Sequence, residues 1–194
     1  MAITTGYGLK PVQLLGGKAF SGGTIREFAV TAGNNTYAFG QGALITIASG
    51  VAKVVGAAAP AAGTLSTNTP VGVLVGLRFN DPTLKQQQHS QYLPADSTGY
   101  TNIYAKVVDD PEVLFQVRVD AALTYTSVGL NVNFVYSAAD SVTGVSKSYC
   151  TGAATTATFP FRIVDVLSGD GSTYTDVIVK YNWQTHAYHF PTGQ

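Results

Sequence analysis

The sequence has little charge, one cysteine and no long apolar run. Charged residues make up 11% of its 194 positions, and eleven basic side chains balance eleven acidic ones. Nucleic-acid binders usually carry a basic excess that neutralises phosphates, so this balance argues against a nucleic-acid partner. Cys150 is the only cysteine, which excludes an internal disulfide. Because no apolar run approaches the ~20 residues that cross a bilayer, we also expect no membrane partner.

The start of the chain, MAITTGYGLK, lacks the basic and apolar regions of a signal peptide. We therefore expect a soluble protein made in a cytoplasm. A net charge of zero is unusual for a free monomer, because net charge keeps proteins apart in solution. Two explanations remain open: other protein covers much of the surface, or the surface is polar through uncharged Ser, Thr, Asn and Gln.

Helix patterns are nearly absent, whereas strand patterns are frequent. Short stretches rich in β-branched and aromatic residues alternate with Gly, Asn, Asp and Pro turn formers. The predicted strands cover 24–30, 37–48, 51–56, 71–79, 102–108, 112–119, 131–136, 147–153, 161–167 and 175–183. About ten short strands at close spacing predict an all-β fold, an antiparallel β-sandwich or barrel.

Two long segments lack a strand pattern. Residues 1–24, with GLKPVQLLGGKAFSGG, are expected to form an extended N-terminal arm, and packing as an edge strand is the alternative. Residues 80–100 are expected to form a long loop, and such loops are often functional. The β-rich body, 25–194, is then either one unit or two lobes, 25–80 and 100–190, joined by that loop.

The stretch KVVDDPEVLFQVRVD holds four of the eleven acidic residues, Asp109, Asp110, Glu112 and Asp120. Alternation from residue 112 places three valines and Phe115 on a core face, with Glu112, Arg118 and Asp120 on a polar face. Asp109 and Asp110 precede a proline, where aspartate side chains bond nearby backbone amides in turns. The acids are therefore explained as a turn followed by a strand, and they predict no catalytic pair or cation site.

No other group of residues matches a catalytic template. The histidines are His89 in a polar loop and the pair His186 and His189 in HAYHF, where an aromatic tail packed on a neighbour is favoured over a metal site. Nucleophile-elbow and phosphate-loop motifs are absent. We predict no catalytic residue, no cofactor and no metal, and hence no enzyme.

Aromatic residues gather near the C-terminus. Alternation through DVIVKYNW places Tyr181 and Trp183 on one face of a strand, and Tyr188 and Phe190 follow. Three interpretations remain open: core packing, a subunit contact anchored by Tyr and Trp, and a sugar-binding platform.

Six blocks of the sequence, taken in order, resemble one family. They are GLKPVQLLGGKAFSGGTIREFAV, TPVGVLVGLRF, DDPEVLFQVRVD, VGLNVNFVY, TTATFPFRIVDVL and DVIVKYNWQTHAY. Together they are similar to the small β-rich structural proteins that tailed phages encode beside the major capsid protein, which are taken to be head decoration, or cement, proteins. The resemblance spans most of the chain. DDPEVLFQVRVD matches best, whereas the NWQTHAY ending departs from the pattern.

The resemblance implies a homotrimer on the outer surface of the virion capsid, with the major capsid protein and other copies of itself as partners. Residues 1–24 and the loops 56–70 and 80–100 would supply the contacts. The side chains expected at interfaces are Tyr7, Lys10, Phe20, Gln87, His89, Tyr92, Trp183, Tyr188 and Phe190. The alternatives are another virion component, such as a tail-tube, head–tail joining or fibre-associated subunit, and a carbohydrate-binding β-sandwich.

Overall fold

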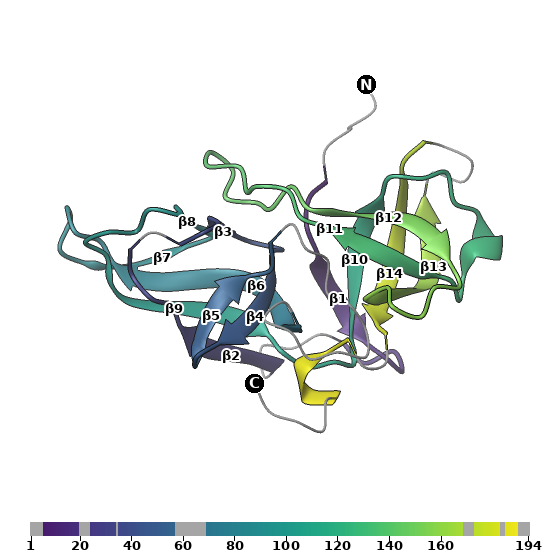
Figure 1. Ribbon diagram of the computed structural model, residues 1–194, viewed down its shortest axis with the longest axis horizontal. Helices are drawn as coiled ribbons and strands as arrows, with labels where there is room; N and C mark the ends of the chain where they lie inside the picture. The colour runs from purple at the N-terminus through teal and green to yellow at the C-terminus, as the bar shows by residue number, and fades with distance from the viewer. Residues whose placement is uncertain are drawn as a thin grey trace.

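The chain is built from strands and short connections (Figure 1). The computed structural model describes residues 6–19, 24–33, 35–56, 69–168, 173–182 and 185–189. Within these ranges there are fourteen strands, two short 3-10 helices and no α-helix. The predicted all-β class is confirmed. The strands are more numerous than expected, because several have only two to four residues and carry no alternation of their own.

One antiparallel sheet forms what we call the first lobe. Its strand order is β2 (Ile25–Ala29), β9 (Thr101–Val108), β6 (Pro70–Asn80), β4 (Leu44–Ala48) and β5 (Val51–Val54), and β7 (Gln87–Ser90) also pairs with β6. A short ladder of β3 (Phe39–Gly40) and β8 (Tyr92–Leu93) accompanies it. The end strands β2 and β5 lie in contact, so the sheet is curled around its own apolar core.

The second lobe is a five-stranded barrel. β10 (Val113–Val119) pairs with β14 (Thr175–Tyr181), β14 with β13 (Phe161–Ser168), β13 with β11 (Asn131–Val135) and β11 with β12 (Tyr149–Ala154). The barrel closes where Val119 of β10 pairs in parallel with Cys150 of β12. The first 3-10 helix, η2 (Tyr125–Ser127), contacts β13. Closure of this kind removes most free strand edges.

The alternation predicted for β10 is confirmed. Val113, Phe115, Val117 and Val119 are all fully buried in the core of the barrel. The ring of Phe115 meets that of Tyr181 edge to face, with centroids 5.6 Å apart. Because each such buried side chain contributes about 1.5–3 kcal/mol relative to exposure, this strand is central to the stability of the second lobe.

The chain from residue 6 to residue 14 is an integral part of the body rather than a free arm. β1 (Lys10–Leu14) pairs antiparallel with β10, as the edge-strand alternative predicts. The Gly8 amide donates to the carbonyl oxygen of Ser148 and the Leu9 amide to that of Gly42, both at 2.9 Å. A Cβ at Gly8 would lie 2.7 Å from the Gly42 oxygen, and its φ of +72° also favours glycine.

The chain passes from the first lobe to the second at residues 109–112, between β9 and β10. The 80–100 segment, expected to be a loop joining the lobes, instead contains β7 and β8 and belongs to the first lobe. The sequence of β7, QQHS, has no apolar alternation, so it gave no strand signal, and main-chain pairing with β6 holds the strand. Residues 57–68, most of the second expected loop, lie outside the described residues.

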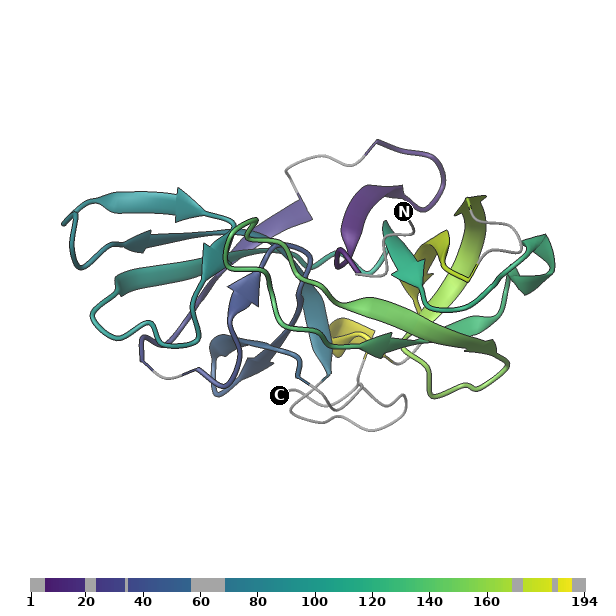
Figure 2. The same cartoon turned by 90° about the horizontal axis from the view of Figure 1, so that it is seen from above.

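Two segments of the second lobe reach back to the first. Figure 2 shows the long turn between β11 and β12, residues 136–148, extending over the first lobe. There the Gln41 amide donates to the Gly144 oxygen, and the Gln41 oxygen accepts from the Ser146 amide, at 2.9 and 2.8 Å. The second 3-10 helix, η3 (Ala187–His189), contacts β6. Together with the N-terminal segment and the crossover, these contacts fix the two lobes to each other.

Candidate partner-binding surface

The structure distributes the predicted interface residues over three places. The first is the junction of the lobes, which holds Tyr7 and Lys10. The second is the strand pair β7 and β8, which carries Gln87, His89 and Tyr92. The third is η3, which carries Tyr188. The other three, Phe20, Trp183 and Phe190, lie outside the described residues.

Tyr7 and Lys10 border a depression that we call the inter-lobe groove. It consists of two adjoining hollows of about 310 and 460 Å³, and Tyr7, Lys10 and Val145 line both. The first hollow continues over Leu74 and other apolar residues of the first lobe. The second continues along the 136–148 turn. The groove therefore has an apolar end and a polar end, with the N-terminal segment along one side.

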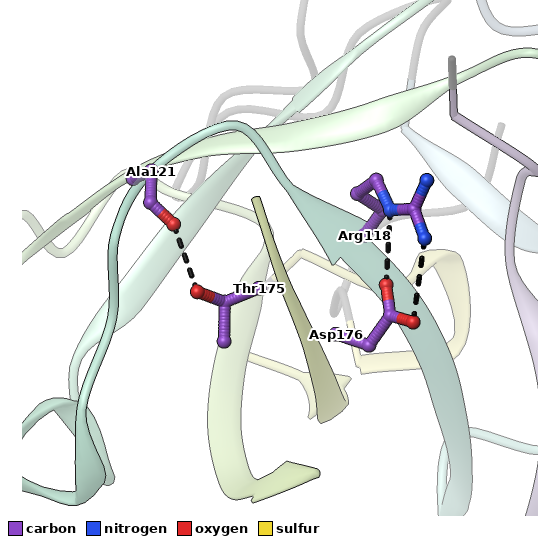
Figure 3. A network of polar contacts seen from close by, with 4 residues as sticks. All are labelled: Arg118, Ala121, Thr175 and Asp176. Atoms are coloured by element: carbon purple, nitrogen blue, oxygen red, sulfur yellow. Dashed lines mark hydrogen bonds and ion pairs between the residues drawn. The ribbon is translucent and has the colours of Figure 1, made fainter. Parts of the chain in front are cut away.

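Two cations lie near the ring of Tyr7. The Lys10 Nζ is 4.3 Å and the Arg118 Cζ 5.3 Å from its centroid, within the range of cation–π attraction. Arg118 is held by Asp176 across β10 and β14, with Nε–Oδ1 at 3.1 Å and Nη2–Oδ2 at 3.5 Å (Figure 3). Burial, reinforced by the Asp176 carboxylate, raises the pKa of Tyr7, so its phenol stays protonated near neutral pH.

Thr175, which precedes Asp176 in β14, fixes the backbone beside this ion pair. Thr175 is fully buried, and its hydroxyl donates to the Ala121 carbonyl oxygen at 3.0 Å (Figure 3). The same hydroxyl oxygen accepts a hydrogen bond from the Leu123 amide at 3.0 Å. The turn after β10 is thereby fixed to the start of β14, which holds Arg118 and Asp176 in register.

The 136–148 turn supplies an ordered wall of the groove. Its Lys147 Nζ lies 2.9 Å from Asp140 Oδ2, and Asp140 Oδ1 accepts hydrogen bonds from the amides of Val142 and Thr143. The Lys147 ammonium and these amides lower the pKa of Asp140 to about 2. Val142, at the tip of the turn, is 91% exposed.

The second surface is polar and lies on β7 and β8. Gln87 and His89 are exposed and, two residues apart, share one side of β7. The His89 Nδ1 lies 3.4 Å from the Lys106 Nζ of β9. Tyr92 is half-buried, and its Cβ would lie 3.4 Å from a Cβ at Gly144. Tyr92 thus adjoins the 136–148 turn.

Tyr188 takes part in a polar cluster at the crossover. Its hydroxyl donates to Asp109 Oδ2 at 2.8 Å, and Arg26 Nε lies 3.0 Å from the same oxygen. Asp109 is only 6% exposed, and its carboxylate contacts Tyr188 and Arg26 rather than a nearby backbone amide, so its predicted role as a turn residue is wrong. The prediction holds for Asp110, whose Oδ1 accepts from the Glu112 amide at 2.9 Å. Burial and the Asp109 carboxylate raise the pKa of Tyr188 to about 12.

The remaining candidate groups are the histidines near the C-terminus and Cys150. In the part of the chain that the structure describes, no three His, Cys, Asp or Glu residues are placed to hold a metal ion. His186 is fully buried, and its Nδ1 accepts a hydrogen bond from the Tyr188 amide at 3.2 Å. Burial and the nearby His189 lower the pKa of His186 to about 4. Cys150 is fully buried, which raises the pKa of its thiol.

Comparison of the chain with protein-family models, curated proteins and solved structures finds no match. Over the described ranges, no helix is long and apolar enough to span a bilayer. The function is therefore inferred from the geometry and from the sequence blocks.

Proposed function

We propose that the chain is a virion structural protein that decorates the outside of an assembled tailed-phage head and bridges neighbouring capsomers. In this proposal it acts without catalysis, as a homotrimer, and its partners are the major capsid protein and its own copies. The observation that carries the proposal is the position in the fold of DDPEVLFQVRVD, the sequence block that best matches the decoration-protein family. That block forms the crossover between the lobes and all of β10, the strand that pairs with β1, β12 and β14.

The way the lobes are joined supports a bridging role. The crossover, residues 6–9, the 136–148 turn and η3 all connect the two lobes. A bridge that holds two capsomers together must resist their separation, and these four connections oppose movement of one lobe relative to the other. Binding only to the assembled shell then stabilises that shell by mass action, and many copies add up through avidity.

The inter-lobe groove is the contact site that we assign to a partner. It carries two of the predicted interface residues, Tyr7 and Lys10, and the ordered wall that ends in Val142. Tyrosine is among the residue types enriched at interfaces and at their hot spots, and Tyr7 lines both hollows. Lys10 is exposed and contributes to no ion pair among the described residues, so its charge is available to an acidic partner surface.

Binding to undecorated heads tests the proposal. The purified chain is mixed with heads of its phage assembled without it, and co-sedimentation and imaging measure occupancy and position. We expect binding at three-fold positions and a trimer mass in solution. Rings or filaments of the purified chain would instead favour a tail-tube or joining subunit. Absence of binding to heads would refute the decoration role.

Variants locate the contact. Lys10→Gln should weaken head binding, and Lys53→Gln, the same change at an exposed position of β5, should leave it unchanged. Deleting residues 1–20 would not test this contact cleanly, because the deletion also removes β1 and the buried Leu9 from the body of the protein. Deletion of residues 1–5 leaves both in place and is the informative truncation.

A further inference from the structure

A third hollow lies where β13 and β14 of the second lobe meet the crossover and η3, and it shares no lining residue with the inter-lobe groove. It has a volume of about 290 Å³ and is lined by Pro111, Glu112, Arg162, Lys180, Asn182 and His189, together with Tyr181. We propose that this hollow binds an oxyanion, the phosphate or carboxylate group of a ligand, between Arg162 and Lys180. The inference concerns the isolated chain and does not depend on the decoration role.

The first argument is the pairing of two like charges. Arg162 of β13 and Lys180 of β14 are directly opposite partners in the antiparallel ladder, so their side chains leave the same face of the sheet. Like charges in that position destabilise a ladder unless something neutralises them. Neither cation has an ion-pair partner within 4.0 Å among the described residues. An anion between them would turn this repulsion into attraction on both sides.

The second argument is that the arginine is held in place. Asn131 is 4% exposed, and its Oδ1 accepts a hydrogen bond from Arg162 Nε at 3.1 Å. The Asn131 amide is fixed in turn, because its Nδ2 donates to the Thr156 carbonyl oxygen at 3.0 Å. Only the Nε of Arg162 is used, so the N–H groups of its two terminal nitrogens have no acceptor among the described residues. A guanidinium anchored at one nitrogen is pre-organised to bind an oxyanion with the other two.

The third argument is the size and charge balance of the hollow. A volume of about 290 Å³ is at the small end of ligand sites and suits a phosphate or carboxylate group rather than a large molecule. Glu112 is the only acidic residue among the described residues that line the hollow. Two cations and one carboxylate leave one net positive charge, which a single oxyanion neutralises.

The presence of Glu112 allows a specific test, because removing a cation from the hollow should weaken anion binding and removing this carboxylate should strengthen it. The amide signals of residues in the hollow are followed by NMR while inorganic phosphate or acetate is added to the full-length chain at constant ionic strength. Arg162→Gln should weaken phosphate binding at least about tenfold, through the loss of charge-assisted hydrogen bonds. Lys180→Gln should also weaken it. Glu112→Gln should tighten it about threefold, since the one carboxylate of the lining, which repels an anion, is removed.

Two matched controls exclude a general charge effect. Lys53→Gln removes one positive charge from an exposed site on the first lobe, and Asp120→Asn removes one negative charge at the far end of β10. Both should leave the affinity unchanged. Phosphate binding several times tighter than acetate would identify a phosphate group as the ligand, and similar affinities would identify a carboxylate, such as an acidic side chain of a partner. Equal binding by all variants, or no tightening in Glu112→Gln, would overturn the proposal.

Discussion

The buried imidazole of His186 predicts a loss of stability in mild acid. Its side chain is fully buried, and burial together with the nearby His189 lowers its pKa from the usual 6.5 to about 4. A lowered folded-state pKa means that the unfolded chain binds a proton first as the pH falls. The contribution of His186 is therefore complete above pH 6.5 and is lost progressively as the pH approaches 4.

The size of this effect follows from the two pKa values. Between pH 7.5 and pH 5 the unfolded chain gains nearly a full proton at this site, whereas the folded chain gains about a tenth of one. The difference lowers the free energy of unfolding by about 2 kcal/mol. Most carboxylates keep their charge over this interval, so the shifted pKa of His186 is the main source of the change.

Urea unfolding at pH 7.5 and pH 5 measures the effect. The wild-type chain should lose about 2 kcal/mol, and His186→Gln should lose less than about 0.5 kcal/mol, whatever its stability at pH 7.5. His89→Gln, at an exposed position of β7, should keep the full loss. An equal loss in His186→Gln, or an NMR titration of His186 with a midpoint near 6.5 in the folded chain, would refute the reasoning.

Three further predictions concern single side chains. Phe115→Ala should lower the free energy of unfolding by about 3–5 kcal/mol in urea, because it empties a fully buried site in the barrel, and a loss below 1 kcal/mol would contradict that packing. Cys150 should react with a thiol reagent only after unfolding, and rapid labelling of the native chain would show that it is accessible. Tyr188→Phe should cost about 1–2 kcal/mol by removing a donor to the buried Asp109, whereas Tyr125→Phe, at a 67% exposed site, should cost almost nothing.

The features that the sequence predicts well are those encoded locally. The core face of β10 follows from alternation over seven residues, and the turn at Asp110 follows from an aspartate before a proline. The all-β class follows from the same local signals repeated along the chain. Each of these needs only neighbouring residues, and each is confirmed.

The features that the sequence does not predict depend on distant partners. Alternation places Arg118 beside Asp120, yet the structure pairs it with Asp176, 58 residues further on. The sequence around Asp109 predicts a turn residue, but its carboxylate contacts Arg26 and Tyr188, which lie far from it on either side in the sequence. The inter-lobe groove and the hollow beside Arg162 and Lys180 are both lined by segments far apart in the sequence, so no local motif could have located them.

The pairing of β1 with β10 has a consequence for how the chain folds. Lys10 lies opposite Gln116, so the first strand to be synthesised meets its neighbour only after about a hundred further residues have been made. The first lobe, whose strands all lie between residues 25 and 108, can collapse in the meantime. Pairings between such distant segments are slow to form, because a long loop must close before any contact stabilises it. We therefore expect a folding intermediate with an ordered first lobe, in which residues 6–14 have not yet paired with β10. In that intermediate the edge of β10 that β1 covers is exposed and can pair with a strand of another chain.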